Sequence, residues 1–341
     1  MSFLRGCFPM LRLSIVSFLL VVLLFQPALA GQKLTKLTVG YSAIAIEQLP
    51  AWVAKETGIF VKNGIDADLV YFPAGTTAIM ALLSGGTAIS ESAGPETANA
   101  YIGGADPAFI AAGRVTIAFW LVGRKDIKTP EQLKKGSVSI SRFGSVSDFV
   151  ANFAVQKLGL VPGKDVTIVQ FGGSTERLTA LESGRTEATV LPSPNVFIAQ
   201  KRGLNVMVDV SEAGMAFQFT GAISTRKYIR ENPDIVRSYV KSHLEAVHLM
   251  KTDKATGMRV LAKYYAQYKD RESLEKGYDD YITEKSLPRK QYPSLPGLKT
   301  VLDYLAERDP KAKTVKPEDL VDDRFIREFD QSGFIDGLYK K

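Results

Sequence analysis

The sequence has almost no cysteine and very little histidine. Of its 341 residues, one is cysteine (Cys7) and two are histidine (His243 and His248). We expect Cys7 to be removed with an N-terminal segment, which leaves no thiol for a disulfide or a metal site. Both histidines lie far along the chain from the loops that are described below as candidate ligand-binding loops. No catalytic Ser/His pair can therefore be built in those loops. The sequence therefore predicts no catalytic residue, no metal site and no cofactor.

The sequence also lacks runs of basic residues. It holds 43 Lys and Arg against 36 Asp and Glu, a formal net charge of +7. Without Arg5 and Arg12 the 43 become 41, and the net charge becomes +5. The two signs are interspersed, whereas a nucleic-acid-binding protein concentrates Lys and Arg in a patch or stripe. We predict no nucleic-acid partner.

One long apolar run lies at the N-terminus. Residues 11–24 are almost wholly apolar. Ala28-Leu29-Ala30 then supplies the small residues after which signal peptidase cleaves. The run is short for a membrane span, although a retained membrane anchor is the alternative. Residues 1–30 are therefore predicted to be a signal peptide cleaved near Ala30, and the protein is predicted to be exported. Translation could start at Met1 or at Met10.

The chain repeats itself at an offset of 99 residues. Across 72–96 and 171–195, eight of 25 positions are identical, where ordinary residue frequencies would give about two. A period this long does not indicate a solenoid; it indicates two copies of one lobe. Two similar lobes leave a cleft between them, and a cleft is where a ligand binds.

Each copy alternates strands and helices, which predicts parallel βαβ units and an α/β fold. In the first copy we predict strands at 37–40, 67–72 and 88–92 and helices at 49–58, 76–84 and 95–102. In the second copy we predict strands at 137–141, 166–171 and 187–191 and helices at 147–158, 175–183 and 194–202. Gly85 and Gly184 follow equivalent helices and are predicted to be left-handed C-terminal caps.

Two apolar stretches, 115–122 and 217–224, flank the second copy and are predicted to be hinge crossovers. After Asn232-Pro233 the pattern is helical, with an apolar stripe at 236, 240, 243, 247 and 250. This helical region is predicted to pack back onto lobe one. The predicted organisation is a signal peptide at 1–30, lobe one at 31–118, lobe two at 119–216 and the second part of lobe one at 217–341.

Short motifs in a constant order give the chain a family resemblance. They include Trp52-Val-Ala-Lys-Glu-Thr-Gly-Ile-Phe, Phe72-Pro-Ala-Gly-Thr-Thr, Ala180-Leu-Glu-Ser-Gly and Ser332-Gly-Phe-Ile-Asp. From about Lys36 to Tyr339 the chain resembles the periplasmic substrate-binding proteins of the nitrate, sulfonate and taurine group of ABC importers. The resemblance implies the two-lobed type II periplasmic binding protein fold, a small-molecule ligand, a membrane permease as partner and a monomer.

The same group resembles the fungal enzymes that build the thiamine pyrimidine. A periplasmic or secreted enzyme on this scaffold is therefore the alternative. Those enzymes consume an active-site histidine and carry a cysteine-rich iron-binding stretch. The chain has no cysteine after position 7, and its histidines are far in sequence from the binding loops. We therefore predict a solute-binding protein that is not an enzyme.

Candidate ligand-binding residues come from the loops that follow the strands. In open α/β sheets ligands bind beyond the carboxyl ends of the strands. These loops are rich in Gly, Ser and Thr and run into helices, whose N-termini favour carboxylate, sulfonate or similar anions. The predicted residues are Tyr41, Ser42, Ala43, Gly75, Thr76, Glu96, Ser141, Arg142, Phe143, Gly144, Ser145, Ser193, Asn195 and Phe217.

The predicted ligand is a small anionic or zwitterionic molecule, and two sets of charged side chains decide between these charges. Arg142 could pair bidentately with an oxyanion, or it could be a solvated surface residue. Glu47 and Glu96 could instead face the cleft and receive an amine or amide. If both signs line the pocket, a zwitterion or a neutral polar heterocycle fits better than bare nitrate. Hydroxyls such as Thr76, Ser147 and Thr175 could simply cap their helices.

Overall fold

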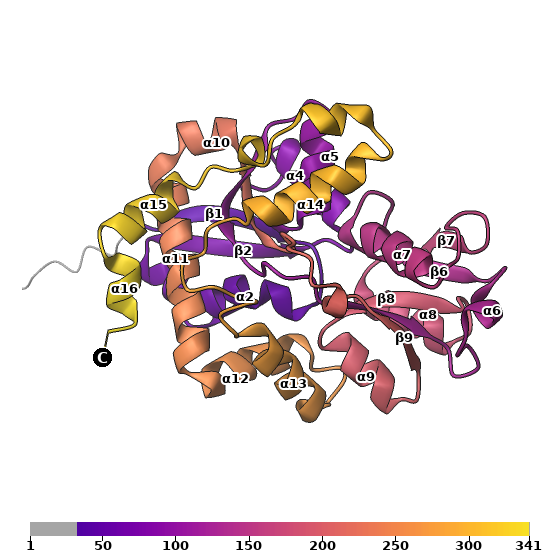
Figure 1. Ribbon diagram of the computed structural model, residues 1–341. Helices are drawn as coiled ribbons and strands as arrows, with labels where there is room; N and C mark the ends of the chain where they lie inside the picture. Colours follow the sequence, from indigo (N-terminus) through magenta and orange to yellow (C-terminus); the bar gives the residue numbers. More distant parts are fainter. Residues whose placement is uncertain (1–32, 341) are drawn as a thin grey trace, which may run out of the picture. The chain divides into compact units, whose positions relative to one another are not determined.

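Two five-stranded sheets, each flanked by helices, form the framework of the chain (Figure 1). The computed structural model describes residues 33–340, so the predicted signal peptide lies outside the described residues. The strand orders are β2-β1-β3-β10-β4 in the first sheet and β7-β6-β8-β5-β9 in the second. Within the described residues, no helix has both the length and the apolar character that crossing a membrane requires.

In the first sheet, β1 runs parallel to β2 and β3, whereas β10 runs antiparallel to β3 and β4. Its strands are β1 (Thr35–Tyr41), β2 (Ile65–Tyr71), β3 (Ile89–Ser92), β4 (Pro107–Ala112) and β10 (Gly221–Thr225). The connecting helices are α2 (Leu49–Glu56), α3 (Ile59–Lys62), α4 (Gly75–Leu83) and α5 (Gly94–Ile102), with a 3-10 turn, η1, at Ile46–Gln48.

The second sheet has the same arrangement. Here β6 runs parallel to β7 and β8, and β5 runs antiparallel to β8 and β9. Its strands are β5 (Phe119–Gly123), β6 (Ser137–Ile140), β7 (Thr167–Gln170), β8 (Ala188–Pro192) and β9 (Asn205–Asp209). Its helices are α6 (Pro130–Leu133), α7 (Val146–Lys157), α8 (Ser174–Glu182) and α9 (Asn195–Lys201).

The 99-residue repeat is present in the strand register as well as in the sequence. In the first sheet Val39 is paired with Leu69 and Ile89. In the second sheet Val138 is paired with Ile168 and Ala188, which are the same three positions shifted by 99. The equivalent helices also end alike, since Gly85 and Gly184 have φ values of +79° and +75°. The predicted duplication and the two predicted caps are confirmed.

The prediction that 115–122 and 217–224 are plain crossovers is wrong for the second half of each stretch. Residues 119–123 form β5, between β8 and β9, and residues 221–225 form β10, between β3 and β4. The crossovers proper are shorter, and they pair with each other through an antiparallel bridge between Thr116 and Ala216. A short apolar run has the same pattern in a buried strand as in a buried linker, so periodicity did not separate the two.

The remaining chain is mostly helical, as predicted, but it becomes helical at Arg226. The helices are α10 (Arg226–Glu231), α11 (Pro233–Thr252), α12 (Lys254–Tyr264), α13 (Arg271–Tyr281), α14 (Leu295–Ala306), α15 (Arg324–Gln331) and α16 (Phe334–Leu338). Further 3-10 turns lie at Ser211–Ala213, Pro310–Thr314 and Pro317–Leu320.

Helix α11 joins this helical region to the first sheet. Its predicted apolar stripe is buried, from Val236 to Met250, and the helix packs on α2 and also contacts β2 and β4 (Figure 1). Helix α14 packs on α5. The helical region therefore covers the lobe that contains the first sheet. The predicted domain boundaries at 118 and 216 stay a prediction.

Candidate functional site

A small cavity lies where loops and helix starts of both sheets meet, with about 40 Å³ available to the centres of water-sized groups. Its lining on the side of the first sheet consists of Ser42, Ala43, Ala45, Glu47, Gln48, Pro73, Gly75, Ala93 and Glu96. The second sheet and its helices contribute Phe119, Ser141, Val146, Ser147, Gly173, Ser174, Arg177 and Pro192, and the returning crossover contributes Phe219 and Thr220.

Glu96 lies in the first turn of α5 and is only 3% exposed. Gly75 makes room for it, because a Cβ atom at position 75 would overlap the Glu96 carboxyl group. Burial raises the pKa of Glu96 to about 7, and the backbone N–H groups of Glu96 and Val146 partly offset this rise. The Oε2 atom has no hydrogen-bond partner among the described residues. Glu96 therefore offers the cavity a free acceptor.

Glu47 supplies a second buried carboxyl group from the 3-10 turn that precedes α2. It is 1% exposed, and neither carboxyl oxygen has a hydrogen-bond partner in the described part of the chain. Burial raises its pKa to about 7, although the positive charge of Arg114 opposes the rise. The Nη1 atom of Arg114 lies 3.6 Å from Glu47 Oε1. The neighbouring Gln48 also faces the cavity with an unpartnered Oε1.

Arg177 brings the opposite charge from α8. It is 3% exposed, and its Nη1 and Nη2 atoms donate to the carbonyl oxygens of Gly172 at 2.7 Å and Val190 at 3.0 Å. Its Nε has no partner among the residues that the structure describes. Burial lowers the pKa of Arg177 to about 10, so the group is still a cation at neutral pH. Charges of both signs therefore line the cavity.

Three serine hydroxyls meet at the start of α7. Ser141 Oγ donates to Ser145 Oγ at 2.9 Å, and Ser147 Oγ lies 2.8 Å from each of the other two hydroxyl oxygens. Ser147 Oγ also accepts the backbone N–H of Ser141 at 2.8 Å. Ser145, not Ser147, is the N-cap, because it accepts the N–H of Asp148. Ser141 and Ser147 line the cavity.

Five of the fourteen predicted residues line this cavity: Ser42, Ala43, Gly75, Glu96 and Ser141. Thr76, Gly144, Ser145 and Ser193 belong to the same loops and helix starts but are not part of the lining. Their contact with a ligand stays a prediction.

The structure puts the other five in different surroundings. Tyr41 packs edge-on against Trp52 in the core, and Phe217 packs on Phe149. Asn195 is buried and accepts the Tyr265 hydroxyl at 2.9 Å. Arg142 and Phe143 are exposed and outside the lining, so the anion hypothesis now depends on Arg177 and not on Arg142. The chain bends at this loop so that Ser141 alone of the three points inward.

A sequence signal for Arg177 and Glu47 was available in the repeat. At the offset of 99, Arg177 corresponds to Ala78, and Glu47 corresponds to Val146. Each carries a charge in one copy only, and Arg142, whose counterpart is Ala43, has the same asymmetry. Arg177 lies inside α8, so a prediction limited to the loops after the strands did not include it.

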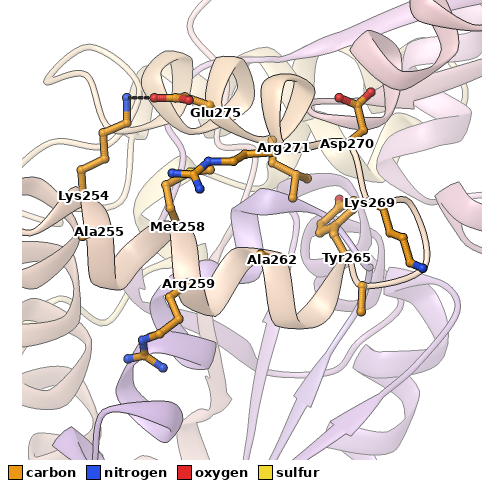
Figure 2. Close-up of a pocket in the computed structure, with 12 residues that line it drawn as sticks. Lys254, Ala255, Met258, Arg259, Ala262, Tyr265, Lys269, Asp270, Arg271 and Glu275 are labelled. Carbon is orange, nitrogen blue, oxygen red and sulfur yellow. Dashed lines mark ion pairs between the residues drawn. The ribbon is translucent and has the colours of Figure 1, made fainter.

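A larger hollow, of about 680 Å³, lies on the surface between α12 and α13 (Figure 2). Its rim carries Lys254, which pairs with Glu275 at 2.9 Å, together with Arg259, Lys269 and Arg271. All of its lining comes from residues 254–275, so the second sheet contributes nothing to it. Buried side chains with unpartnered polar atoms, among them Glu47, Glu96 and Arg177, line the smaller cavity. We therefore take the smaller cavity as the candidate site.

The ligand-free protein is expected to lose stability as the pH rises from about 4.5 to about 7. The pKa values of Glu47 and Glu96 are about 7 in the folded protein, against 4.5 for an ordinary glutamate. Between these values the folded state holds more protons than the unfolded state. The stabilisation is therefore complete below about pH 4.5 and is lost as the pH approaches 7, by up to about 3 kcal/mol for each group.

Urea unfolding at pH 5 and pH 7.5 measures this loss. Burial also raises the pKa of Glu91, which adds to the slope in the same direction. Glu96→Gln should reduce the difference between the two pH values, whereas Glu318→Gln, at an exposed site, should leave it unchanged. Equal unfolding free energies at both pH values in the unsubstituted protein would contradict the prediction.

Within residues 33–340 no group of three or more His, Cys, Asp or Glu side chains is placed to hold a metal ion.

Comparisons with known proteins agree with this architecture. YtlA of Bacillus subtilis (strain 168) is 25% identical over 285 residues, which cover 81% of this chain and 85% of YtlA.

Two solved structures have a similar fold. One is the alkanesulfonate-binding protein SsuA from Xanthomonas axonopodis pv. citri bound to MOPS, with a TM-score of 0.66, 18% identity and coverage of 83% of this chain and 95% of SsuA. The other is the periplasmic nitrate-binding protein NrtA from Synechocystis PCC 6803, with a TM-score of 0.66, 14% identity and coverage of 88% and 89%. These likenesses show the periplasmic binding protein fold. Residues 46–255, well over half of the chain, match the NMT1/THI5 like family, and the protein belongs to that family.

Proposed function

We propose that this protein is an extracytoplasmic solute-binding protein that captures a small molecule with N–H donor groups and delivers it to the permease of an ABC importer. The observation that carries the proposal is the set of unpartnered buried atoms around the cavity: the carboxyl oxygens of Glu47 and Glu96 and the Nε of Arg177. A buried polar group without a partner costs free energy. A ligand that bonds these atoms therefore recovers free energy on binding.

The charges on the lining define the chemical class of this ligand. Carboxylates accept hydrogen bonds from an ammonium or amino group, while the Arg177 Nε donates to an acceptor on the ligand. Phe119 and Phe219, with ring centroids 5.2 Å apart, supply apolar surface. A zwitterion or a neutral polar heterocycle satisfies all three, whereas a bare anion satisfies only Arg177. SsuA and NrtA are named for alkanesulfonate and nitrate, and the two carboxyl groups favour a different ligand here.

The positions of the histidines support binding without turnover. His243 is buried, with Nε2 3.0 Å from Gln291 Oε1 and Nδ1 3.9 Å from Glu91 Oε1. His248 packs edge-on against Tyr339. Neither lines the cavity, so neither can act as a general base toward a hydroxyl there. An enzyme on the same scaffold is the alternative, and turnover of a bound compound would favour it.

The mode of delivery is part of the same proposal. Cleavage of residues 1–30 would release a periplasmic monomer, and closure about the two crossovers would enclose the ligand. Direct bonds already join the two sides of the cavity. Ser174 Oγ donates to Ile44 O at 3.1 Å, and the hydroxyl of Tyr265, which directly follows α12, donates to Asn195 Oδ1 on α9. The ligand would strengthen this closed arrangement by bridging Glu47 and Glu96 to Arg177.

Matched pairs of compounds test the ligand class. Taurine and isethionate differ only in an ammonium group in place of a hydroxyl, and 4-aminopyrimidine and pyrimidine differ only in an amino group. We expect the N–H-bearing member of at least one pair to bind at least tenfold more tightly by calorimetry. At 100 times its dissociation constant it should stabilise the protein by about 2.7 kcal/mol.

Two variants provide the controls for this screen. Glu47→Gln removes a cavity carboxylate and should lower the affinity of the protein for the preferred compound. Glu245→Gln removes a carboxylate that pairs with Lys62 outside the cavity, and it should bind like the unsubstituted protein. Equal affinity for both members of every pair would contradict the proposed ligand class.

A further inference from the structure

We propose that Glu96 determines specificity by excluding simple anions from the start of α7. The inference rests on the proposed function in one respect, that the cavity is the ligand site. It adds that the same site would accept a sulfonate or a similar oxyanion if the Glu96 carboxylate were not there.

The start of α7 has the features of an anion-binding site, which we call the anion seat. The helix is 12 residues long, so its first turn presents N–H groups and a partial positive charge. The hydroxyls of Ser141 and Ser147 add donors at the cavity wall, and each is hydrogen-bonded in a cluster that can rotate its protons. Arg177, almost fully buried, adds an unpartnered N–H from the neighbouring helix α8.

Glu96 already occupies this seat from the opposite side. Glu96 and Val146, the first residue of α7, line the same cavity, and the backbone N–H of Val146 lowers the pKa of the Glu96 carboxyl group. The carboxyl group therefore takes the position that a ligand oxyanion would take. Its Oε2 atom remains unpartnered and faces the cavity, which makes the seat attractive to an N–H donor and repulsive to an anion.

The carboxyl group has little freedom to leave. Glu96 is 97% buried, and its side chain lies against Gly75, where there is no side chain to displace. At pH 8 it is mostly ionised, because its pKa is about 7. With about 40 Å³ of free space, an anion without an N–H donor would lie close to this carboxylate and would be repelled by it.

Substitution of Glu96 tests the inference with ethanesulfonate, sulfate and nitrate as probes at pH 8. Glu96→Ser removes the charge and opens the seat, and it should bind at least one of these anions at least tenfold more tightly than the unsubstituted protein by calorimetry. Glu96→Gln removes the charge at nearly constant size and should gain less. Glu91→Gln removes another buried carboxyl group, one that bonds Tyr239 outside the cavity, and it should gain nothing.

The possible outcomes separate this inference from the proposed function. Tight binding of the anions by the unsubstituted protein at pH 8 would overturn the inference. So would a failure of both Glu96 variants to gain anion affinity while circular dichroism shows that they are folded. If Glu96→Ser gains anion affinity but no N–H-bearing compound binds the unsubstituted protein, the proposed ligand class fails and the role of Glu96 stands.

Discussion

Replacing Arg114 by methionine is expected to lower the free energy of unfolding by about 3–5 kcal/mol. Arg114 lies in the segment between β4 and β5, just before the predicted crossover stretch 115–122, and is 2% exposed. Its Nη2 bonds Asp280 on α13 at 2.6 Å, while its Nη1 lies 3.6 Å from the Glu47 carboxyl group. Glu47 is buried, so the loss of Arg114 leaves the Glu47 carboxyl group uncompensated in a low-dielectric interior, whereas the Asp280 side chain is 44% exposed and can be solvated. The loss should therefore be much larger than for a surface pair.

Urea unfolding at pH 7.5 measures this effect. The double variant Arg114→Met with Glu47→Gln should recover part of the loss, because the carboxyl charge that Arg114 compensates is then absent. Lys299→Met breaks the exposed pair with Asp303 and should cost less than about 1 kcal/mol. If the two single variants lose the same stability, the buried group around Arg114 is not what holds the crossover to α13.

Replacing Trp52 by alanine should also cost about 3–5 kcal/mol. Trp52 is fully buried in α2, stacks on Tyr264 of α12 with ring centroids 4.1 Å apart, and meets the edge of Tyr41. The truncation leaves a cavity where the helical region packs on the first lobe. Thermal and urea unfolding measure the loss, and Met80→Ala, at an exposed site, should stay within about 0.5 kcal/mol.

Ligand binding gives a second readout for Trp52. The indole does not line the cavity, so the folded Trp52→Ala protein should keep its affinity for whichever compound the screen identifies. A loss of unfolding free energy below about 1 kcal/mol would mean that the aromatic stack is not the contact that joins α2 to α12.

The candidate site was predictable in kind but only partly in the residues that line its cavity. Glu96 and Ser141 could be found because they end or follow strands, and the carboxyl ends of parallel strands meet at one edge of a sheet. That Arg142 lies outside the cavity lining could not be predicted, because the sequence does not say which way a loop side chain points. Arg177 and Ser141 come together only when α8 and the loop after β6 are placed over the same sheet edge.

The sequence by itself determined the duplication, the alternation of strands and helices, and the caps at Gly85 and Gly184. Each of these depends on neighbours in the chain or on a repeat that is visible by alignment. Only the tertiary structure decided that β5 joins the second sheet and β10 the first, and that Arg114 lies between the buried Glu47 and the exposed Asp280. Arg114 and Asp280 are 166 positions apart in the sequence. A local sequence pattern cannot predict a contact between side chains so far apart, because only the packing of the folded chain brings them together.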